Sequence, residues 1–337
     1  MLLTRPFLLA AAASALALAG WLALRPGWDG PAAPAPAPRE RLREPVGAVD
    51  VADGLGAVAV ARGDLWMDDR SGRRLLRVDG ATGAVRAALP VTGRLAIGAG
   101  PSGVWALEAG GDYGIGLRGP LLRVDPATGA VRARVGLGGA LGFGVLASGR
   151  DVWVWGPRDV LRVDPRAGRV VQRIRVGGAH GELRGVAIRR GELVVAAADG
   201  RLLRYDARSG ARRGAISVPF GAPVIRARHG RRLVLSSRGR LALVDPLTGR
   251  VAWRRRLGFR AGAVVPRGGL LWTVSAARED PGDRLSALDP ATGELRASAV
   301  LPAFGTTAMV RQGGRLWLAT AGGRAVAVRP AALAGRG

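Results

Sequence analysis

Apolar residues alternate with polar ones in short runs that recur along most of the chain. The clearest copy spans residues 121–135, where Leu-Leu-Arg-Val-Asp is followed by Pro-Ala-Thr-Gly and by a second alternating run, Ala-Val-Arg-Ala-Arg-Val. Alternation with a period of two is typical of strands with one buried face, and Asp-Pro-x-Thr-Gly supplies the backbone conformations that a tight turn needs. Each copy therefore predicts a β-hairpin.

The copies are regularly spaced. Two further short apolar runs precede each hairpin, as at residues 56–60 and 64–67, so each unit contains four predicted strands. A repeat of about 40–45 residues with four strands predicts the blades of a β-propeller. The aspartates that end the first strand of each hairpin lie 46, 39, 42, 39 and 44 residues apart, at Asp79, Asp125, Asp164, Asp206, Asp245 and Asp289.

The last unit is incomplete at its C-terminal end. Residues 307–310, 316–319 and 325–329 provide three strands, and no fourth strand follows. Residues 44–51 have the pattern of the missing outer strand. We therefore expect an all-β, seven-bladed propeller of four-stranded antiparallel blades over residues 45–331, closed by this N-terminal strand, because an unclosed ring would leave a sheet edge exposed. Six blades with a frayed end is the alternative.

Tryptophan recurs at one place in the predicted second strands. Wide apolar rings at a repeated position are expected to fill the space between neighbouring blades. A stacking platform for a planar ligand is the alternative. The five residues are Trp66, Trp105, Trp153, Trp272 and Trp317.

The N-terminal residues have the pattern of a targeting segment. Residues 6–24 carry no charge and contain an Ala-Leu-Ala sequence that resembles a cleavage site, but the apolar run also approaches the length of a membrane helix. We expect residues 1–30 to be a signal peptide or membrane anchor, residues 31–44 to be a Pro/Ala-rich linker, and residues 332–337 to be a tail. This predicts an extracytoplasmic propeller that is secreted, periplasmic or anchored to the membrane.

Basic residues greatly exceed acidic ones. The chain has 51 Lys+Arg against 25 Asp+Glu, all of the basic residues are arginines, and the formal net charge is +26. This excess forms either a solvated rim or a surface that attracts an anionic membrane or polysaccharide. Nucleic acid is not an expected partner, because aromatic residues are scarce and no groove-reading motif is present. Arginines gather on the predicted fourth strands, where we expect them to point toward solvent, as at Arg132, Arg134, Arg173 and Arg175.

Candidate chemistry is sparse. With two histidines and no cysteine, the chain is not expected to form a zinc site, and we predict no catalytic residue. Carboxylates gather between predicted second and third strands, on the face that also carries the connections between blades. A small molecule, an envelope protein or a hard cation such as Mg²⁺ or Ca²⁺ could bind there, and ordinary polar loop residues are the alternative. The predicted ligand-binding residues are His180, Glu182, Arg260, Asp68, Glu108 and Asp280.

The repeat is similar to those of known propeller families. Leu-x-Arg-Val-Asp-Pro-Ala-Thr-Gly-x-Val-x-Ala-x-Val, followed by a strand and then by Gly-x-x-Val/Leu-Trp, resembles the YVTN-type and streptogramin-lyase-like (virginiamycin B lyase-like) repeats from residue 45 to about residue 330. For the lyases the resemblance implies a Mg²⁺-assisted elimination with catalytic His and Glu residues on late blades. Residues 260–331 contain no histidine, so the resemblance carries over the architecture and not the catalytic set.

One unit also resembles a different family. Residues 245–253, Asp-Pro-Leu-Thr-Gly-Arg-Val-Ala-Trp, resemble one repeat of the quinoprotein (PQQ-type) propellers, which carry a tryptophan at this place in most blades. The other copies lack that tryptophan, so we do not expect PQQ to bind. They have Ala87, Ala133, Gln172, Gly214 and Ala297 at the equivalent position.

These patterns predict a binding protein. We expect an exported or membrane-tethered monomeric propeller that binds a ligand or protein partner through its loop-bearing face without catalysing a reaction. A divalent-cation-dependent lyase or hydrolase of the streptogramin-lyase-like group is the alternative. The two differ in whether the loop carboxylates hold a metal ion.

Overall fold

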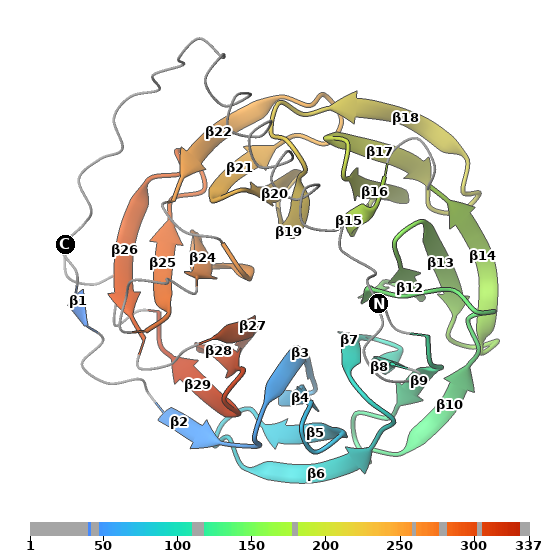
Figure 1. The fold of residues 1–337 in the computed structure, drawn as a ribbon, viewed down its shortest axis with the longest axis vertical. Coiled ribbons are helices and arrows are strands. Elements are labelled where there is room, and N and C mark those ends of the chain that lie inside the picture. Colours follow the sequence, from blue (N-terminus) through green and yellow to red (C-terminus); the bar gives the residue numbers. More distant parts are fainter. Residues whose placement is uncertain are drawn as a thin grey trace, which may run out of the picture. The chain divides into compact units, whose positions relative to one another are not determined.

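The protein is a seven-bladed β-propeller (Figure 1). The computed structural model describes residues 40–41, 47–109, 118–176, 181–257, 261–275, 282–301 and 305–330. In each blade the first strand lies next to the central axis and the fourth strand forms the outer wall (Figure 1). The expected all-β fold is confirmed, and the described residues include no helix long and apolar enough to cross a membrane.

Within each blade the strands pair antiparallel in chain order. Blade one contains β3 (Leu55–Ala61), β4 (Asp64–Asp69), β5 (Arg74–Asp79) and β6 (Val85–Pro90), and blade two contains β7 (Leu95–Gly100), β8 (Gly103–Glu108), β9 (Leu121–Val124) and β10 (Val131–Val135). Blade three contains β11 (Gly144–Ser148), β12 (Asp151–Trp155), β13 (Asp159–Asp164) and β14 (Arg169–Arg175), and blade four contains β15 (Leu183–Arg189), β16 (Glu192–Ala197), β17 (Arg201–Asp206) and β18 (Arg212–Ser217). Blade five contains β19 (Val224–His229), β20 (Arg232–Ser237), β21 (Arg240–Val244) and β22 (Val251–Arg256), and blade six contains β23 (Val264–Arg267), β24 (Leu270–Ser275), β25 (Arg284–Leu288) and β26 (Leu295–Val300).

Blade seven is built from both ends of the propeller sequence. It contains β27 (Thr306–Gln312), β28 (Arg315–Thr320) and β29 (Arg324–Val328), and its outer strand is β2 (Gly47–Asp50), which pairs antiparallel with β29. The predicted closure by the N-terminal strand is therefore confirmed. The short strand β1 (Glu40–Arg41) is not among the expected elements, and it pairs parallel with β26 at the outer edge of blade six.

The hydrophobic core consists of separate clusters between neighbouring blades. The tryptophans of the second strands fill these spaces, since all five side chains are at most 1% exposed. Trp105 of blade two, for example, packs with Val152 and Leu161 of blade three. The prediction that these rings fill the space between blades is confirmed. Blades four and five have Val194 and Val234 at the equivalent strand position.

The repeated aspartates hold the turns between third and fourth strands. Oδ1 of Asp125 accepts hydrogen bonds from the backbone N–H groups of Ala127 (2.8 Å) and Thr128 (3.3 Å), as the turn pattern predicts. Oδ2 of Asp125 binds Arg132, seven residues further along the chain. The same pair forms in three other blades, between Asp79 and Arg86, Asp206 and Arg213, and Asp289 and Arg296.

Several of the predicted solvent-facing arginines are therefore engaged in ion pairs. The side chains of Arg132, Arg134 and Arg173 are 40–59% exposed, as expected. Arg132 binds Asp125 at 2.8 Å, Arg173 binds Asp159 at 2.6 Å, and Nη1 of Arg134 lies 3.6 Å from Glu108. The guanidinium of Arg132 and the turn N–H groups lower the pKa of Asp125 to about 2. These three arginines thus point toward solvent as expected, and each also has an acidic neighbour within its own blade.

Deleting residues 44–51 should destabilise the whole ring. The deletion removes β2, whose four residues pair with β29, and each lost backbone hydrogen bond costs about 1 kcal/mol. We expect the free energy of unfolding, measured in urea, to fall by about 4 kcal/mol in one cooperative transition. Deletion of residues 332–337, which the sequence predicts to be a tail, is the control. Equal stability of the two truncated proteins would show that β2 is dispensable.

Candidate functional site

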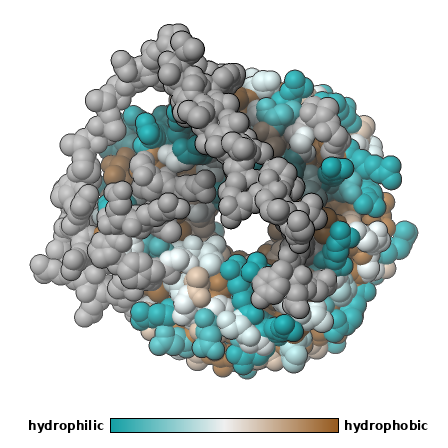
Figure 2. Space-filling view, in the orientation of Figure 1, coloured by the Kyte–Doolittle hydropathy of each residue, from teal (hydrophilic) through white to brown (hydrophobic). Residues whose placement is uncertain are grey.

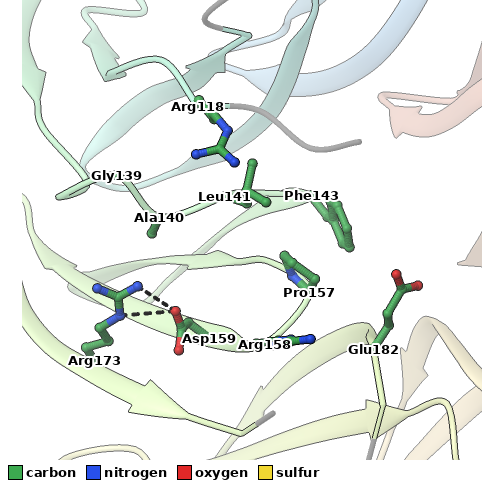
Figure 3. Close-up of a pocket in the computed structure, with 10 residues that line it drawn as sticks. All are labelled: Arg118, Gly139, Ala140, Leu141, Phe143, Pro157, Arg158, Asp159, Arg173 and Glu182. Atoms are coloured by element: carbon green, nitrogen blue, oxygen red, sulfur yellow. Dashed lines mark hydrogen bonds and ion pairs between the residues drawn. The ribbon is translucent and has the colours of Figure 1, made fainter. Parts of the chain in front are cut away.

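One face of the propeller carries both the connections between blades and the connections between second and third strands. Figure 3 shows a pocket on this face, formed where blades two, three and four meet. Its volume is about 520 Å³, within the range of about 300–1,000 Å³ that is usual for ligand pockets. This pocket is therefore large enough to hold a ligand, and it lies on the face where the sequence predicts ligand binding.

Four connections and one strand pair supply the walls. The connection from β10 to β11 provides the largest share, and Glu182 comes from the connection between β14 and β15. Apolar side chains lie between charged ones in the close-up (Figure 3). The lining residues are Arg118, Gly139, Ala140, Leu141, Phe143, Pro157, Arg158, Asp159, Arg173 and Glu182.

Tight backbone contacts fix the shape of this pocket. The N–H of Phe143 donates to the carbonyl of Trp155 at 2.6 Å, and the two aromatic rings pack edge to face. A Cβ atom on Gly156 would come within 1.8 Å of the Leu141 carbonyl oxygen, so only glycine allows this approach. The N–H of Leu183 donates to the carbonyl of Pro157 and thereby places the adjacent Glu182 at the pocket.

The pocket has free charges of both signs. The side chains of Arg118 and Arg158 are exposed and have no hydrogen bond or ion pair with the described residues, and Glu182 is likewise exposed. Arg173 and Asp159, by contrast, neutralise each other through two hydrogen bonds of 2.6 and 3.1 Å (Figure 3). A guanidinium binds carboxylates well, and a carboxylate accepts from N–H and ammonium groups. The pocket can therefore hold a ligand with an acidic group, an apolar part and a hydrogen-bond donor.

Asp68 and Glu108 lie together elsewhere, at the interface between blades one and two. Asp68 lies in β4 and Glu108 ends β8, so the prediction that they lie in the connections between second and third strands is wrong. Both side chains are at most 2% exposed. Strand alternation turns the Asp68 side chain toward blade two, where its carboxylate faces the backbone N–H of Leu95. It turns Glu108 toward Thr92, whose backbone N–H donates to Oε1 at 3.1 Å. The structure brings these two predicted residues to one interface.

Both carboxylates of this interface retain unsatisfied oxygens. Neither oxygen of Asp68, nor Oε2 of Glu108, has a hydrogen bond of ordinary geometry with the described residues, although Arg70 approaches Asp68 to 3.6 Å. Burial raises the pKa of Asp68 to about 6, and the Leu95 N–H and Arg70 only partly offset this effect. Among the residues that the structure describes, no three acidic or histidine side chains are grouped to hold a metal ion.

The predicted site residues thus do not form one site. Glu182 lines the pocket, and Asp68 and Glu108 lie between blades one and two. His180, Arg260 and Asp280 fall outside the described residues.

Comparison with known proteins assigns a family. The model of the family described as outer membrane protein assembly factor BamB, a family of PQQ-like repeats, matches residues 118–213 and 237–333, which is more than half of the chain. The chain belongs to this family. The PQQ-type likeness of residues 245–253 is therefore supported, whereas the likeness to YVTN-type and streptogramin-lyase-like propellers stays a prediction.

Solved structures share the fold of this BamB-family protein. The computationally designed Ika8 protein is 13% identical, with a TM-score of 0.59, and the match covers 85% of this chain and 98% of that one. A chain of a mitotic checkpoint complex is 15% identical, with a TM-score of 0.67, and the match covers 91% and 98%. Such low identities show the fold alone. No curated protein sequence matches the chain.

Most of the pocket in this BamB-family protein cannot be predicted from the sequence. Arg118 and Arg158 follow the pattern of an arginine-rich surface, and nothing local distinguishes them. Phe143 gives a usable signal, since an aromatic residue among the glycines of residues 136–144 has no strand to pack within. Gly156 becomes informative only once the Leu141 carbonyl is seen against it.

Replacing Asp68 by asparagine should change how stability depends on pH. The pKa of Asp68 is higher in the folded protein than its ordinary value of 3.8, so its favourable contribution is complete below that value and is lost as pH rises through about 6. From pH 4.5 to 7.5 we expect the free energy of unfolding of Asp68→Asn to gain about 2 kcal/mol relative to the parent protein. Guanidinium unfolding at the two pH values measures this, and parallel changes in both proteins would contradict it.

Proposed function

We propose that this BamB-family propeller binds an extended segment of a partner protein in the pocket between blades two, three and four, without catalysing a reaction. The observation that carries the proposal is the pair of unpartnered guanidinium groups, Arg118 and Arg158, in one apolar hollow with Glu182. A polypeptide offers acidic, apolar and N–H groups in sequence, and it can satisfy all three parts of this pocket. A simple anion would satisfy the arginines but would be repelled by Glu182.

The second part of the proposal is the location. The family is associated with the bacterial envelope, and its description names outer membrane protein assembly. Residues 1–30 would export the propeller or anchor it in the membrane, and residues 31–44 would separate it from that membrane as an extended Pro/Ala-rich spacer. The partner would then be an envelope protein.

Photocrosslinking in cells tests the binding site and captures whichever partner occupies it. With p-benzoylphenylalanine in place of Phe143, we expect discrete adducts that are lost in the charge-reversed variant Arg118→Glu/Arg158→Glu. The same group in place of Leu247, an exposed residue of a turn between third and fourth strands, is the control on the opposite face. Adducts of equal yield at both positions, or adducts that persist in the variant, would contradict binding in the pocket.

Export is tested separately. Residues 1–44 fused to a reporter that is active only outside the cytoplasm should give a signal, and a fusion that lacks residues 1–30 should not. A silent reporter together with a soluble full-length product in the cytoplasm would exclude the proposed location. It would leave the binding proposal to be judged by the crosslinking result.

A further inference from the structure

Positive charge is concentrated in three consecutive blades. Residues 144–256, which form blades three to five, contain 25 arginines and 8 acidic residues. Residues 55–135 contain 11 arginines and 7 acids, and residues 264–328 contain 7 arginines and 5 acids. A uniform preference for arginine in the genome would not place the excess on one side of a ring. The asymmetry therefore calls for a local explanation.

Blade five is the extreme case. Its residues, 224–256, include ten arginines and a single acidic residue, Asp245. Oδ1 of Asp245 holds the turn by accepting the Leu247 N–H at 2.7 Å. Position 252, where four other blades have an arginine that pairs with the turn aspartate, is Ala252. Within this blade a single acidic side chain is thus available to offset the charge of ten arginines.

Two arginines of blade five oppose each other directly. Arg240 begins β21 and Arg256 ends β22, and the two residues are partners in the antiparallel ladder. Both side chains are exposed and neither has a hydrogen bond or ion pair with the described residues. Like charges at directly opposed positions destabilise a sheet. An external anion between the two guanidinium groups would remove the repulsion.

A third arginine at the same corner has an unfavourable backbone conformation. Arg238 and Gly239 form the two-residue turn between β20 and β21, with φ values of 44° and 74°. Asparagine, aspartate or glycine is preferred where a turn of this type needs a positive φ, and a long side chain is disfavoured. Exposed Arg238 therefore adds charge beside Arg240 at a conformational cost. We call Arg238, Arg240 and Arg256 the blade-five corner.

We propose that the wall formed by blades three to five, including the blade-five corner, is a docking surface for an acidic polysaccharide. Guanidinium groups bind carboxylates in bidentate geometry, and a flexible polymer can follow the convex wall across three blades (Figure 1). Hydrophilic side chains cover much of the visible rim where β14 lies (Figure 2). This surface does not depend on the pocket proposed above.

The chemistry of the wall favours a polysaccharide over two other anionic partners. Among the described residues the exposed large hydrophobic side chains are Val85, Val171, Leu247 and Leu295, and none is aromatic. Single-stranded nucleic acid is usually held by stacking of bases on aromatic rings. A bilayer is flat and would meet a convex wall along a narrow strip. Carboxylated sugar polymers need neither aromatic side chains nor a flat contact.

The test compares two variants of the full chain with the same net charge. Arg238→Asn/Arg240→Gln/Arg256→Gln removes the blade-five corner. The control variant is Arg62→Asn/Arg311→Gln/Arg329→Gln. It removes three exposed arginines, one in blade one, one in blade seven and one directly after β29, and none of them has a partner among the described residues. Arg62 is matched to Arg238, because it also precedes a glycine in a turn, with a φ of 50°. The probes are polygalacturonate, single-stranded DNA and vesicles that contain phosphatidylglycerol.

We expect polygalacturonate to bind the unmodified chain at 50 mM NaCl and to lose about tenfold or more in affinity by 200 mM, as several charged contacts require. The corner variant should bind about tenfold more weakly at 50 mM, and the control variant should change affinity by less than about twofold. The melting temperature of the corner variant should equal or exceed that of the parent, because repulsion and an unfavourable turn residue are removed.

Three kinds of result would overturn the proposal. The first is no binding of polygalacturonate at 50 mM NaCl, or equal weakening by both variants, which would leave only a response to net charge. The second is tighter, corner-dependent binding of DNA or of vesicles, which would assign the surface to that partner. The third is a corner variant that melts well below the parent, which would show that these arginines stabilise the fold. None of these results bears on crosslinking at Phe143.

Discussion

The structure depends on burial of both faces of every blade between two neighbours. Each second strand presents a tryptophan or valine to the next blade, so no blade completes its core alone. The ring must close for the first and last blades to have the same environment as the others. At the closure, the hydroxyl of Thr307 donates to blade one, and the indole N–H of Trp317 donates to the Gly80 carbonyl at 3.2 Å. Closure therefore joins sequence ends about 250 residues apart in one cooperative unit.

This constraint leaves the connections free to differ. The strands must repeat the same alternation in every blade, whereas the connections on the loop-bearing face need only span the distance between strands. The pocket arises where residues 136–143 make a longer connection that packs back on Trp155. Residues of opposite charge are collected there without disturbing the repeat beneath them. Site and scaffold are thus separable in this chain, as they are in repeat proteins generally.

Much of the scaffold can be predicted from the sequence, because its signals are local and repeated. Alternation, turn residues and the period fix strand number, and the pattern of residues 44–51 identifies the closing strand. The site depends on contacts between blades, which no local pattern encodes. Asp68 is two residues after the buried Trp66, so strand alternation indicates that Asp68 is buried on the same side. Its acidic side chain, by contrast, favours a loop, and the prediction followed that second signal. The pairing of Arg132 with Asp125 likewise depends on how the hairpin folds.

Arginine has two roles in this propeller, and the distinction decides where a partner can bind. In blades one, two, four and six an arginine of the fourth strand binds the aspartate of the preceding turn, and bonds at that carboxyl lower the pKa of Asp79 and Asp125 to about 2. These arginines support the hairpin and offer little to an external ligand, because their charge is already compensated. Blade five replaces that arginine by Ala252 and places Arg240 opposite Arg256 instead. Arginine thus stabilises the hairpin where it faces an acidic side chain. Where no acidic side chain faces it, as in blade five, it leaves an uncompensated positive charge at the surface.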